Sequence, residues 1–200
     1  AFLVGQVARA FQTVATSLPP WYAAERFEEA AYGMLVADGL GGAGGGDVAS
    51  RLAVATFVNL VLHTPDWIMR VGNEEADRLM DRIADRYRKV GAAVAERAAE
   101  DAALTRMGTT MTLACSSGED LFIGHVGDSR AYLLRGGDLI RLTRDHTYAL
   151  ELADAGMISQ REVERHRLRH VLTRALGPSR WTWPASACTT ATCSCSAPTG

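Results

Sequence analysis

Lysine is almost absent from this 200-residue sequence. Lys89 is the only one, against twenty arginines, a bias that a GC-rich coding sequence explains. Positive charge is not in excess either, since the net charge is −2; we expect no nucleic-acid partner and no membrane-surface partner. No uninterrupted apolar run reaches the roughly 18 residues of a membrane span, and the start shows no secretory signal pattern.

Cysteine is also scarce. The first 180 residues hold only Cys115, within an apolar, strand-like run, which predicts a reducing, cytoplasmic setting. The length favours one domain, and an apolar content of 48% is enough for a sizeable core.

Glycine, in contrast, is concentrated in the stretch Tyr32–Ser50. An apolar run ends at Asp38, six glycines crowd the next eight residues, and an amphipathic run begins at Asp47. This order predicts a buried strand, a loop of unusual dihedral angles and a helix. A carboxylate at a strand end, beside backbone that a ligand can approach closely, favours a site for a metal ion or a phosphate.

The chain predicts an α+β fold. Residues 1–4 are typical of a strand, and residues 19–29 of a loop leading back to the strand at Tyr32. Apolar residues at helical spacing predict two long helices, at residues 47–63 and 73–101. From Gly108 the period changes to two, which predicts a meander of four antiparallel strands packed under the helices, at residues 109–115, 121–126, 131–134 and 139–142. Helices at 146–155 and from Ser159 to about His166 follow, and then a strand at 170–176.

One rival interpretation is a dinucleotide fold, because Gly39–Gly44 matches G-x-G-x-x-G between a strand and a helix. That fold needs a second parallel strand and an acidic residue about 20 positions further on. Here the helix leads into Thr64–Trp67 and another helix, and Asp38 would face a pyrophosphate without a counter-ion. The interpretation fits poorly.

A second informative stretch runs from Phe122 to Tyr132, where an apolar strand breaks at Gly127 and presents Asp128, Ser129 and Arg130. Alone, this is more simply a turn with an ion pair. Together with other motifs in the same order, it resembles the metal-dependent protein serine/threonine phosphatases of type 2C, the PPM family, in their bacterial form. The matching segments cover roughly residues 1–178: 36–42, 46–50, 107–110, 125–132, 142–147 and 172–177.

The resemblance implies an antiparallel β-sandwich flanked by helices in four layers, incomplete at both ends. It also implies two Mn²⁺ or Mg²⁺ ions, with a third, weaker one, and a water that attacks phosphorus without a phospho-enzyme intermediate. Carboxylate and carbonyl oxygens are suitable ligands for such hard cations.

The resemblance also implies roles for individual residues. Asp38 is expected to bridge two metal ions, the Gly39 carbonyl to bind one of them, and Asp128 to hold the third. Asp38 and Asp128 are the expected catalytic residues. Ser129 and Arg130 are expected to orient Asp128, and residues 41–46 to serve the course of the backbone. Residues 149–169 occupy the place of the family's mobile flap, which influences substrate choice.

The sequence departs from the family in several places. Many relatives have a histidine, cast as general acid, where Leu40 stands, so the acid is unassigned. His125, His146 and His170 are most simply core residues or supports for metal ligands. An arginine and a Glu-Asp pair are expected before Ala1, and Asp-Gly and Asp-Asn motifs after Gly177; we expect this chain to be a fragment lacking them.

The last residues, 181–200, have no charge and no Leu, Val or Ile, but three of the four cysteines. When residues 181–200 are translated back into codons and the reading frame is shifted to start at each codon's third base, the shifted frame encodes a charged turn, an apolar strand and an Asp-Gly pair. We therefore predict a partial phosphatase domain at residues 1–178 and a frameshift product at 179–200. The rival view, a metal site at Cys188, Cys193 and Cys195, matches no common zinc spacing.

The predicted function is metal-dependent hydrolysis of phosphoserine and phosphothreonine in proteins, opposing a serine/threonine kinase. Activity should be feeble in a chain with part of the metal site, and uncovered apolar faces should limit its solubility. The alternative is a non-catalytic, phosphatase-like binding module.

Overall fold

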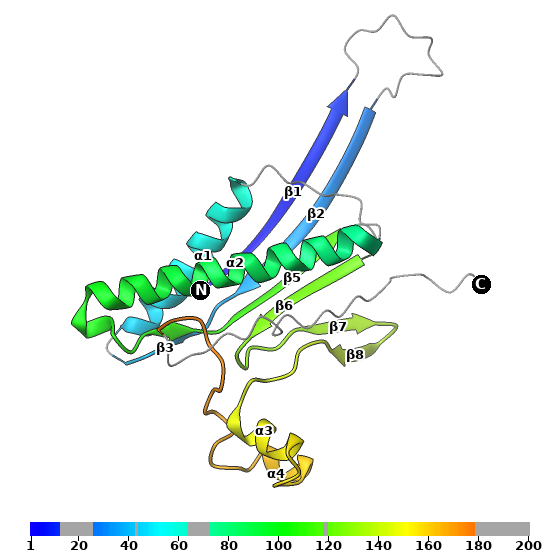
Figure 1. The fold of residues 1–200 in the computed structure, drawn as a ribbon. Coiled ribbons are helices and arrows are strands. Elements are labelled where there is room, and N and C mark those ends of the chain that lie inside the picture. The colour runs from blue at the N-terminus through cyan, green and yellow to red at the C-terminus, as the bar shows by residue number, and fades with distance from the viewer. Residues whose placement is uncertain (13–25, 43, 64–72, 118–119, 179–200) are drawn as a thin grey trace, which may run out of the picture.

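The computed structural model describes residues 1–12, 26–42, 44–63, 73–117 and 120–178 (Figure 1). Along the chain, the elements are β1 (Phe2–Gln12), β2 (Arg26–Val36), β3 (Gly39–Leu40), α1 (Gly45–Leu62), α2 (Asn73–Glu100), a 3₁₀ turn (Ala102–Leu104), β4 (Gly108–Thr109), β5 (Met111–Ser117), β6 (Asp120–Val126), β7 (Tyr132–Arg135), β8 (Asp138–Arg141), α3 (Tyr148–Asp154) and α4 (Gln160–Val163). The predicted α+β class is confirmed. The tail expected to be a frameshift product lies outside the described residues.

The main sheet has four antiparallel strands in the order β1-β2-β5-β6. Its register pairs Leu35 of β2 with Leu113 of β5, and Thr112 of β5 with His125 of β6. Because side chains alternate along a strand, one face carries Leu35 and Leu113 and the other carries Thr112 and His125. Every described strand pair is antiparallel, which excludes the dinucleotide fold.

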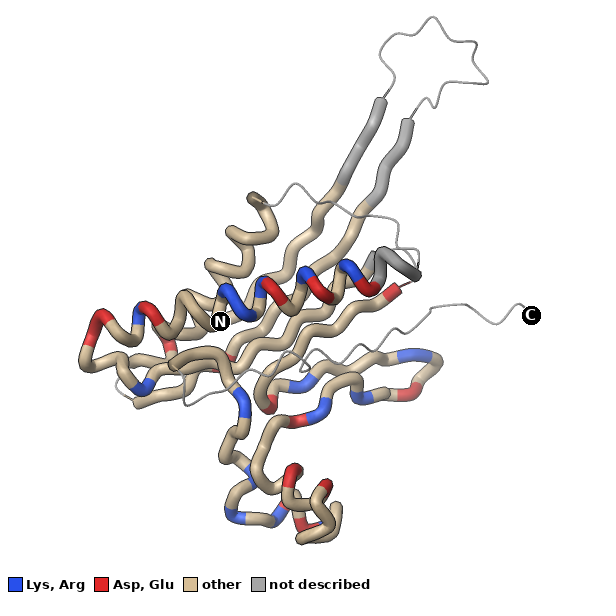
Figure 2. Tube along the Cα trace, in the orientation of Figure 1, with Lys and Arg blue, Asp and Glu red and all other residues tan. Residues whose placement is uncertain are grey.

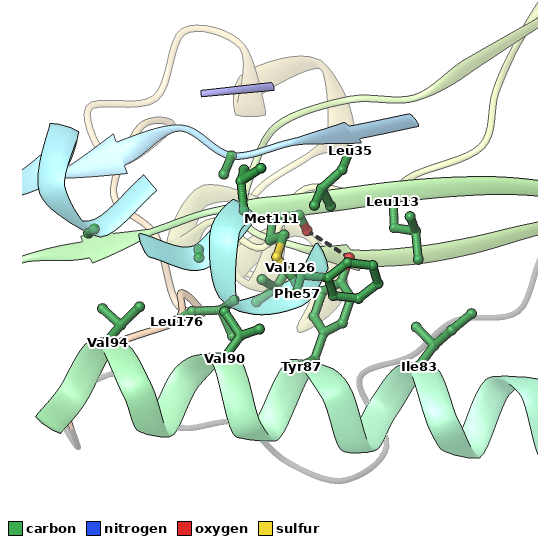
Figure 3. Close-up of a cluster of buried hydrophobic side chains, with 14 of the residues drawn as sticks. Leu35, Phe57, Ile83, Tyr87, Val90, Val94, Met111, Leu113, Val126 and Leu176 are labelled. Atoms are coloured by element: carbon green, nitrogen blue, oxygen red, sulfur yellow. Dashed lines mark hydrogen bonds between the residues drawn. The ribbon is translucent and has the colours of Figure 1, made fainter. Parts of the chain in front are cut away.

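Helices α1 and α2 cover the Leu35 face of this sheet (Figure 1). Helix α2 presents the predicted buried stripe at steps of three and four residues, with Met80, Ile83, Tyr87, Val90 and Val94, and the stripe continues to Ala98. Tyr87 is fully buried beside Phe57 of α1 (Figure 3). Its hydroxyl donates a hydrogen bond to the Gly124 carbonyl oxygen at 2.9 Å. A Cβ on Gly124 would lie 2.9 Å from Ile83, so glycine here lets α2 pack closely on β6.

Helix α1 is long and apolar enough to cross a membrane by length and composition alone, with a hydropathy of 1.3 over its 18 residues; it is the one such helix among the described residues. Asp47, Arg51 and Asn59 interrupt its apolar residues, so a count of uninterrupted runs passes over it. Packing accounts for its apolar face, because the hydrophobic core contains Ala49, Ala53, Val54 and Phe57.

The opposite face of β1 and β2 carries large apolar side chains that the described residues leave exposed. Phe2 is 78% exposed and Val4 is 70% exposed, and Tyr32, Met34 and Val36 are also exposed. The expectation of an uncovered apolar sheet face is therefore met in the described part of the chain. Its consequence for solubility stays a prediction.

The two long helices begin and end within two residues of their predicted bounds, but other expectations were wrong. Residues 26–29, expected in a loop, extend β2, because cross-strand pairing with β1 continues as far as Arg26 and Gln12. The predicted four-stranded meander is interrupted: among the described strands, β7 and β8 pair only with each other, since the chain turns away at Gly127. Residues 170–176 make isolated bridges at Leu172 and Leu176 in place of a strand.

Candidate metal centre

Asp38 follows the end of β2, where Ala37 is buried and Asp38 is exposed. The backbone of Asp38 is fixed on both sides by two consecutive threonines. Its carbonyl oxygen accepts from the Thr110 backbone N–H at 2.8 Å and from the Thr109 hydroxyl at 2.9 Å. Its own N–H donates to Thr110 Oγ1 at 3.1 Å. The position of this carboxylate is therefore set by the start of the β4–β5 segment.

Asp128 follows the end of β6, and the Thr110 side chain contacts the next residue, Ser129. Thr110 Oγ1 is 2.8 Å from Ser129 Oγ, and the Thr112 hydroxyl donates to the Ser129 carbonyl oxygen at 3.1 Å. Gly127 has φ +107°, and a Cβ there would lie 2.4 Å from Thr110 Cγ2. Glycine thus allows the turn that brings residues 128–129 against Thr110. The fully buried Thr110 side chain thus links the backbone N–H of Asp38 to the side chain of Ser129, the neighbour of Asp128.

The two predicted carboxylates also interact electrostatically. Burial raises the pKa of Asp128, and the negative charges of Asp145 and Asp38 raise it further. Asp38 and Asp128 are far apart in sequence, yet each lies in the electric field of the other. Two carboxylates that repel each other, one of them partly desolvated, favour a cation between them.

The glycine run shapes the backbone around Asp38. A Cβ on Gly39 would lie 1.8 Å from the Gly46 carbonyl oxygen, so β3 and the start of α1 approach as closely as only glycine permits. Gly41 and Gly44 have φ values of +104° and +84°, and Gly44 is the N-cap of α1. This agrees with the expectation that these glycines serve the course of the backbone.

Arg130 does not orient Asp128, contrary to expectation. It forms a bidentate ion pair with Asp145, with Nη2 2.7 Å from Oδ2 and Nε 3.1 Å from Oδ1, and Arg141 contacts the same carboxylate. Burial acts to raise the pKa of Asp145, but the Arg130 hydrogen bonds and the Arg141 charge outweigh burial and lower it. Sequence reasoning missed the role of Asp145 because its bidentate partner, Arg130, precedes it by 15 residues and lies on the other side of the β7–β8 hairpin.

Two of the three histidines are packed behind the site. His125 is buried, and its ring stacks on His146 with centroids 5.0 Å apart. Its Nδ1 lies 2.8 Å from Thr112 Oγ1 and its Nε2 lies 3.0 Å from the Arg144 carbonyl oxygen. The Gly127 N–H donates to His146 Nδ1 at 3.1 Å, and burial lowers the pKa of His146 to about 4. His170 is exposed, so it is not a core residue.

The donor set suits a hard divalent cation, but it is small. Asp38 and Asp128 supply carboxylate oxygens, and Gly39 lies next to Asp38 with a backbone carbonyl. Within the described residues, no group of three or more Asp, Glu, His or Cys side chains could hold a metal ion. Affinity for Mg²⁺ and similar ions rises with the number and charge of the oxygen ligands. These residues therefore fit such an ion as part of a site.

Comparison with known proteins identifies the family. A sequence model of the family described as protein phosphatase 2C matches residues 22–175. The chain belongs to this family. The match includes Asp38, Asp128 and the threonines between them, so the site described above lies inside the matched domain.

Individual relatives agree. The chain is 35% identical over 143 residues to the serine/threonine protein phosphatase PstP of Mycobacterium tuberculosis, covering 72% of this chain and 26% of that protein. It is 34% identical over 144 residues to the serine/threonine phosphatase stp of Listeria welshimeri, covering 72% of this chain and 55% of that protein. The chain thus spans a quarter to about half of the length of these relatives.

Solved structures extend the comparison to the fold. The crystal structure of M. tuberculosis PstP matches with a TM-score of 0.61 at 30% identity, covering 86% of this chain and 68% of that chain. A second PstP structure, the catalytic domain in complex with two manganese ions, matches with a TM-score of 0.56 at 27% identity, covering 88% and 68%. The predicted fold family is therefore confirmed.

Proposed function

We propose that this chain carries the metal-binding core of an enzyme that hydrolyses phosphoserine and phosphothreonine in proteins. Family membership supports this proposal, as do the names of the phosphatase relatives. The observation that carries it is the Thr110 side chain, which hydrogen-bonds to the Asp38 N–H and to the Ser129 hydroxyl. Through this link, carboxylates from two distant strand ends share one site.

Mn²⁺ or Mg²⁺ is the proposed cofactor, and the manganese-containing PstP structure favours Mn²⁺. Asp38 and Asp128 would hold the ions, together with the Gly39 carbonyl. When bound, such ions lower the pKa of a water ligand and neutralise the oxygens of a phosphate. The chain itself holds Asp38 in place through the backbone bonds to Thr109 and Thr110. It also keeps Asp128 partly desolvated, which strengthens its attraction for a cation.

Catalysis by this chain is expected to be weak. Two carboxylates and one carbonyl are fewer ligands than a divalent ion prefers, so Mn²⁺ should bind with low affinity. Leu40 stands where many relatives carry a histidine, and a leucine side chain cannot protonate a leaving group. The alternative of a non-catalytic binding module predicts that no completed version of the chain hydrolyses phosphate esters.

The proposed substrates are phosphoproteins, and the proposed opposing enzyme is a serine/threonine kinase. A cytoplasmic setting is proposed because Cys115 is the only cysteine in the first 180 residues, and it is a free thiol.

The test compares Mn²⁺-dependent hydrolysis of p-nitrophenyl phosphate by this chain and by an N-terminally extended version with the tail frame restored. Activity only in the completed version supports the proposal, and the Asp38→Asn variant of that version should lose it. Activity in neither version would favour the binding module. Re-sequencing the coding DNA around codons 177–182 tests the frameshift separately, because an independently confirmed unbroken frame ends that hypothesis.

A further inference from the structure

The segment Arg165–Arg174, here called the basic segment, has a charge pattern unlike the rest of the chain. Its ten residues contain four arginines and two histidines and no acidic residue, whereas arginine makes up about one residue in ten of the whole sequence. Arg165, Arg167, Arg169 and His170 are exposed. Figure 2 shows several lysine or arginine positions gathered below the main sheet, near the short helices α3 and α4.

The three exposed arginines of the basic segment differ from Arg130, Arg141 and Arg144 in their ion pairs. Arg130 and Arg141 are paired with Asp145, and Arg144 with Asp154. No ion pair joins Arg165, Arg167 or Arg169 to any described residue. Of the two acidic residues just before the segment, Glu162 accepts hydrogen bonds from the Ser159 N–H and hydroxyl, each at 2.7 Å, in a capping box, and Glu164 is the exposed C-cap of α4.

Backbone hydrogen bonds lead from the basic segment to the candidate metal centre. The Thr173 N–H donates to the His146 carbonyl oxygen at 3.0 Å. The His146 N–H in turn donates to the carbonyl oxygen of Gly127, the residue before Asp128, at 2.7 Å. Just beyond the segment, Leu176 and Thr109 exchange backbone bonds of 2.8 and 2.9 Å.

We propose that Arg165, Arg167 and Arg169 recognise acidic residues flanking the phosphorylated serine or threonine of a substrate protein. This inference rests on the proposed function, because it places the phosphate at Asp38 and Asp128 and the flanking residues along the basic segment. Guanidinium groups bind carboxylates through paired hydrogen bonds, and unpaired exposed arginines are available for them. A long polyanion is a poorer fit, since the chain as a whole has a net charge of −2.

The experiment measures equilibrium binding by fluorescence anisotropy with the full 200-residue chain and Mn²⁺, so that it does not depend on turnover. The probes are two labelled phosphothreonine peptides, one with glutamates on both sides of the phosphothreonine and one with glutamines. The test variant is R165Q/R167Q/R169Q. The matched control, R51Q/R78Q/R88Q, removes the same charge from exposed positions on α1 and α2.

The proposal predicts that the wild-type chain prefers the acidic peptide, and that the test variant loses about tenfold in affinity for it, as expected for three partly screened ion pairs. The affinity of the test variant for the neutral peptide should differ from that of the wild-type chain by less than about twofold. The affinity of the control variant for either peptide should also differ by less than about twofold.

Equal losses for both peptides, or no detectable binding of either, would overturn the proposal. So would tighter binding of duplex RNA or of phosphatidylserine vesicles that is lost in the test variant, because the segment would then serve a nucleic acid or a membrane surface. A preserved preference for the acidic peptide without hydrolysis in the completed version would refute the proposed function alone.

Discussion

Replacing Thr110 by valine tests how the two aspartates are held together. Valine keeps the volume of the fully buried threonine but removes Oγ1, which accepts the Asp38 N–H at 3.1 Å and lies 2.8 Å from Ser129 Oγ. Each lost hydrogen bond costs about 1 kcal/mol, so the variant should lose roughly 2 kcal/mol of unfolding free energy. Water can reach Ser129 more easily than the buried threonine, which makes this an upper value.

The same change should weaken metal binding, because the Asp38 N–H and the hydroxyl of Ser129, the neighbour of Asp128, are no longer bonded to one hydroxyl. If about 1 kcal/mol of positioning is lost, the Mn²⁺ dissociation constant rises roughly fivefold. Thr110→Ser is the matched control, since it keeps the hydroxyl and removes only a methyl group. Urea denaturation gives the stability, and electron paramagnetic resonance of free Mn²⁺ gives the affinity.

Valine and serine variants that bind Mn²⁺ equally well would refute this reasoning. Such a result would show that the Thr110 hydroxyl stabilises the fold without positioning the carboxylates.

Three further predictions concern stability. Burial depresses the pKa of His146 to about 4, so its contribution to stability is complete above pH 6.5 and falls as the pH drops toward 4. At partial exposure this contribution is about 2 kcal/mol. The variant His146→Asn, which keeps an acceptor for the Gly127 N–H, should make the free energy of unfolding depend less on pH between 6.5 and 4 in denaturation experiments. Tyr87→Phe should cost about 1–2 kcal/mol in urea denaturation, because the buried Gly124 carbonyl loses its 2.9 Å donor, and should leave Mn²⁺ affinity unchanged. Gly127→Ala should lower the free energy of unfolding by more than about 2 kcal/mol, since φ is +107° and the new Cβ meets Thr110. Gly136→Ala, at φ +60° in open space, should lower it by only about 1 kcal/mol. Equal losses in the two variants would contradict the packing argument.

The parts of the fold that sequence predicts well are those set by local periodicity. Helix α2 begins at Asn73 as predicted, because its apolar stripe repeats every three or four residues over many turns. The extension of β2 back to Arg26 was missed because its pairing partner Gln12 lies in another segment, and a charged run such as Glu28–Glu29 is typical of loops. The separate β7–β8 pair was missed because the break at Gly127 is a three-dimensional turn.

The candidate site was likewise predictable from the sequence only in part. Asp38 and Asp128 are conspicuous in sequence as carboxylates at strand ends beside glycine, and the structure brings them within electrostatic reach of each other. The role of Thr110 was hidden, because a threonine in an apolar strand is ordinarily a core residue. The pairing of Arg130 with Asp145 depends on a contact between distant segments that no local pattern indicates.

The most direct test of the account is a double-mutant cycle on Mn²⁺ binding with Asp38→Asn, Asp128→Asn and the double variant. If both carboxylates face one cluster of ions, the two losses in affinity should be coupled by about 1 kcal/mol or more, because removing one ligand changes what the other contributes. Losses that add within about 0.5 kcal/mol would place the two aspartates in independent sites and contradict the account.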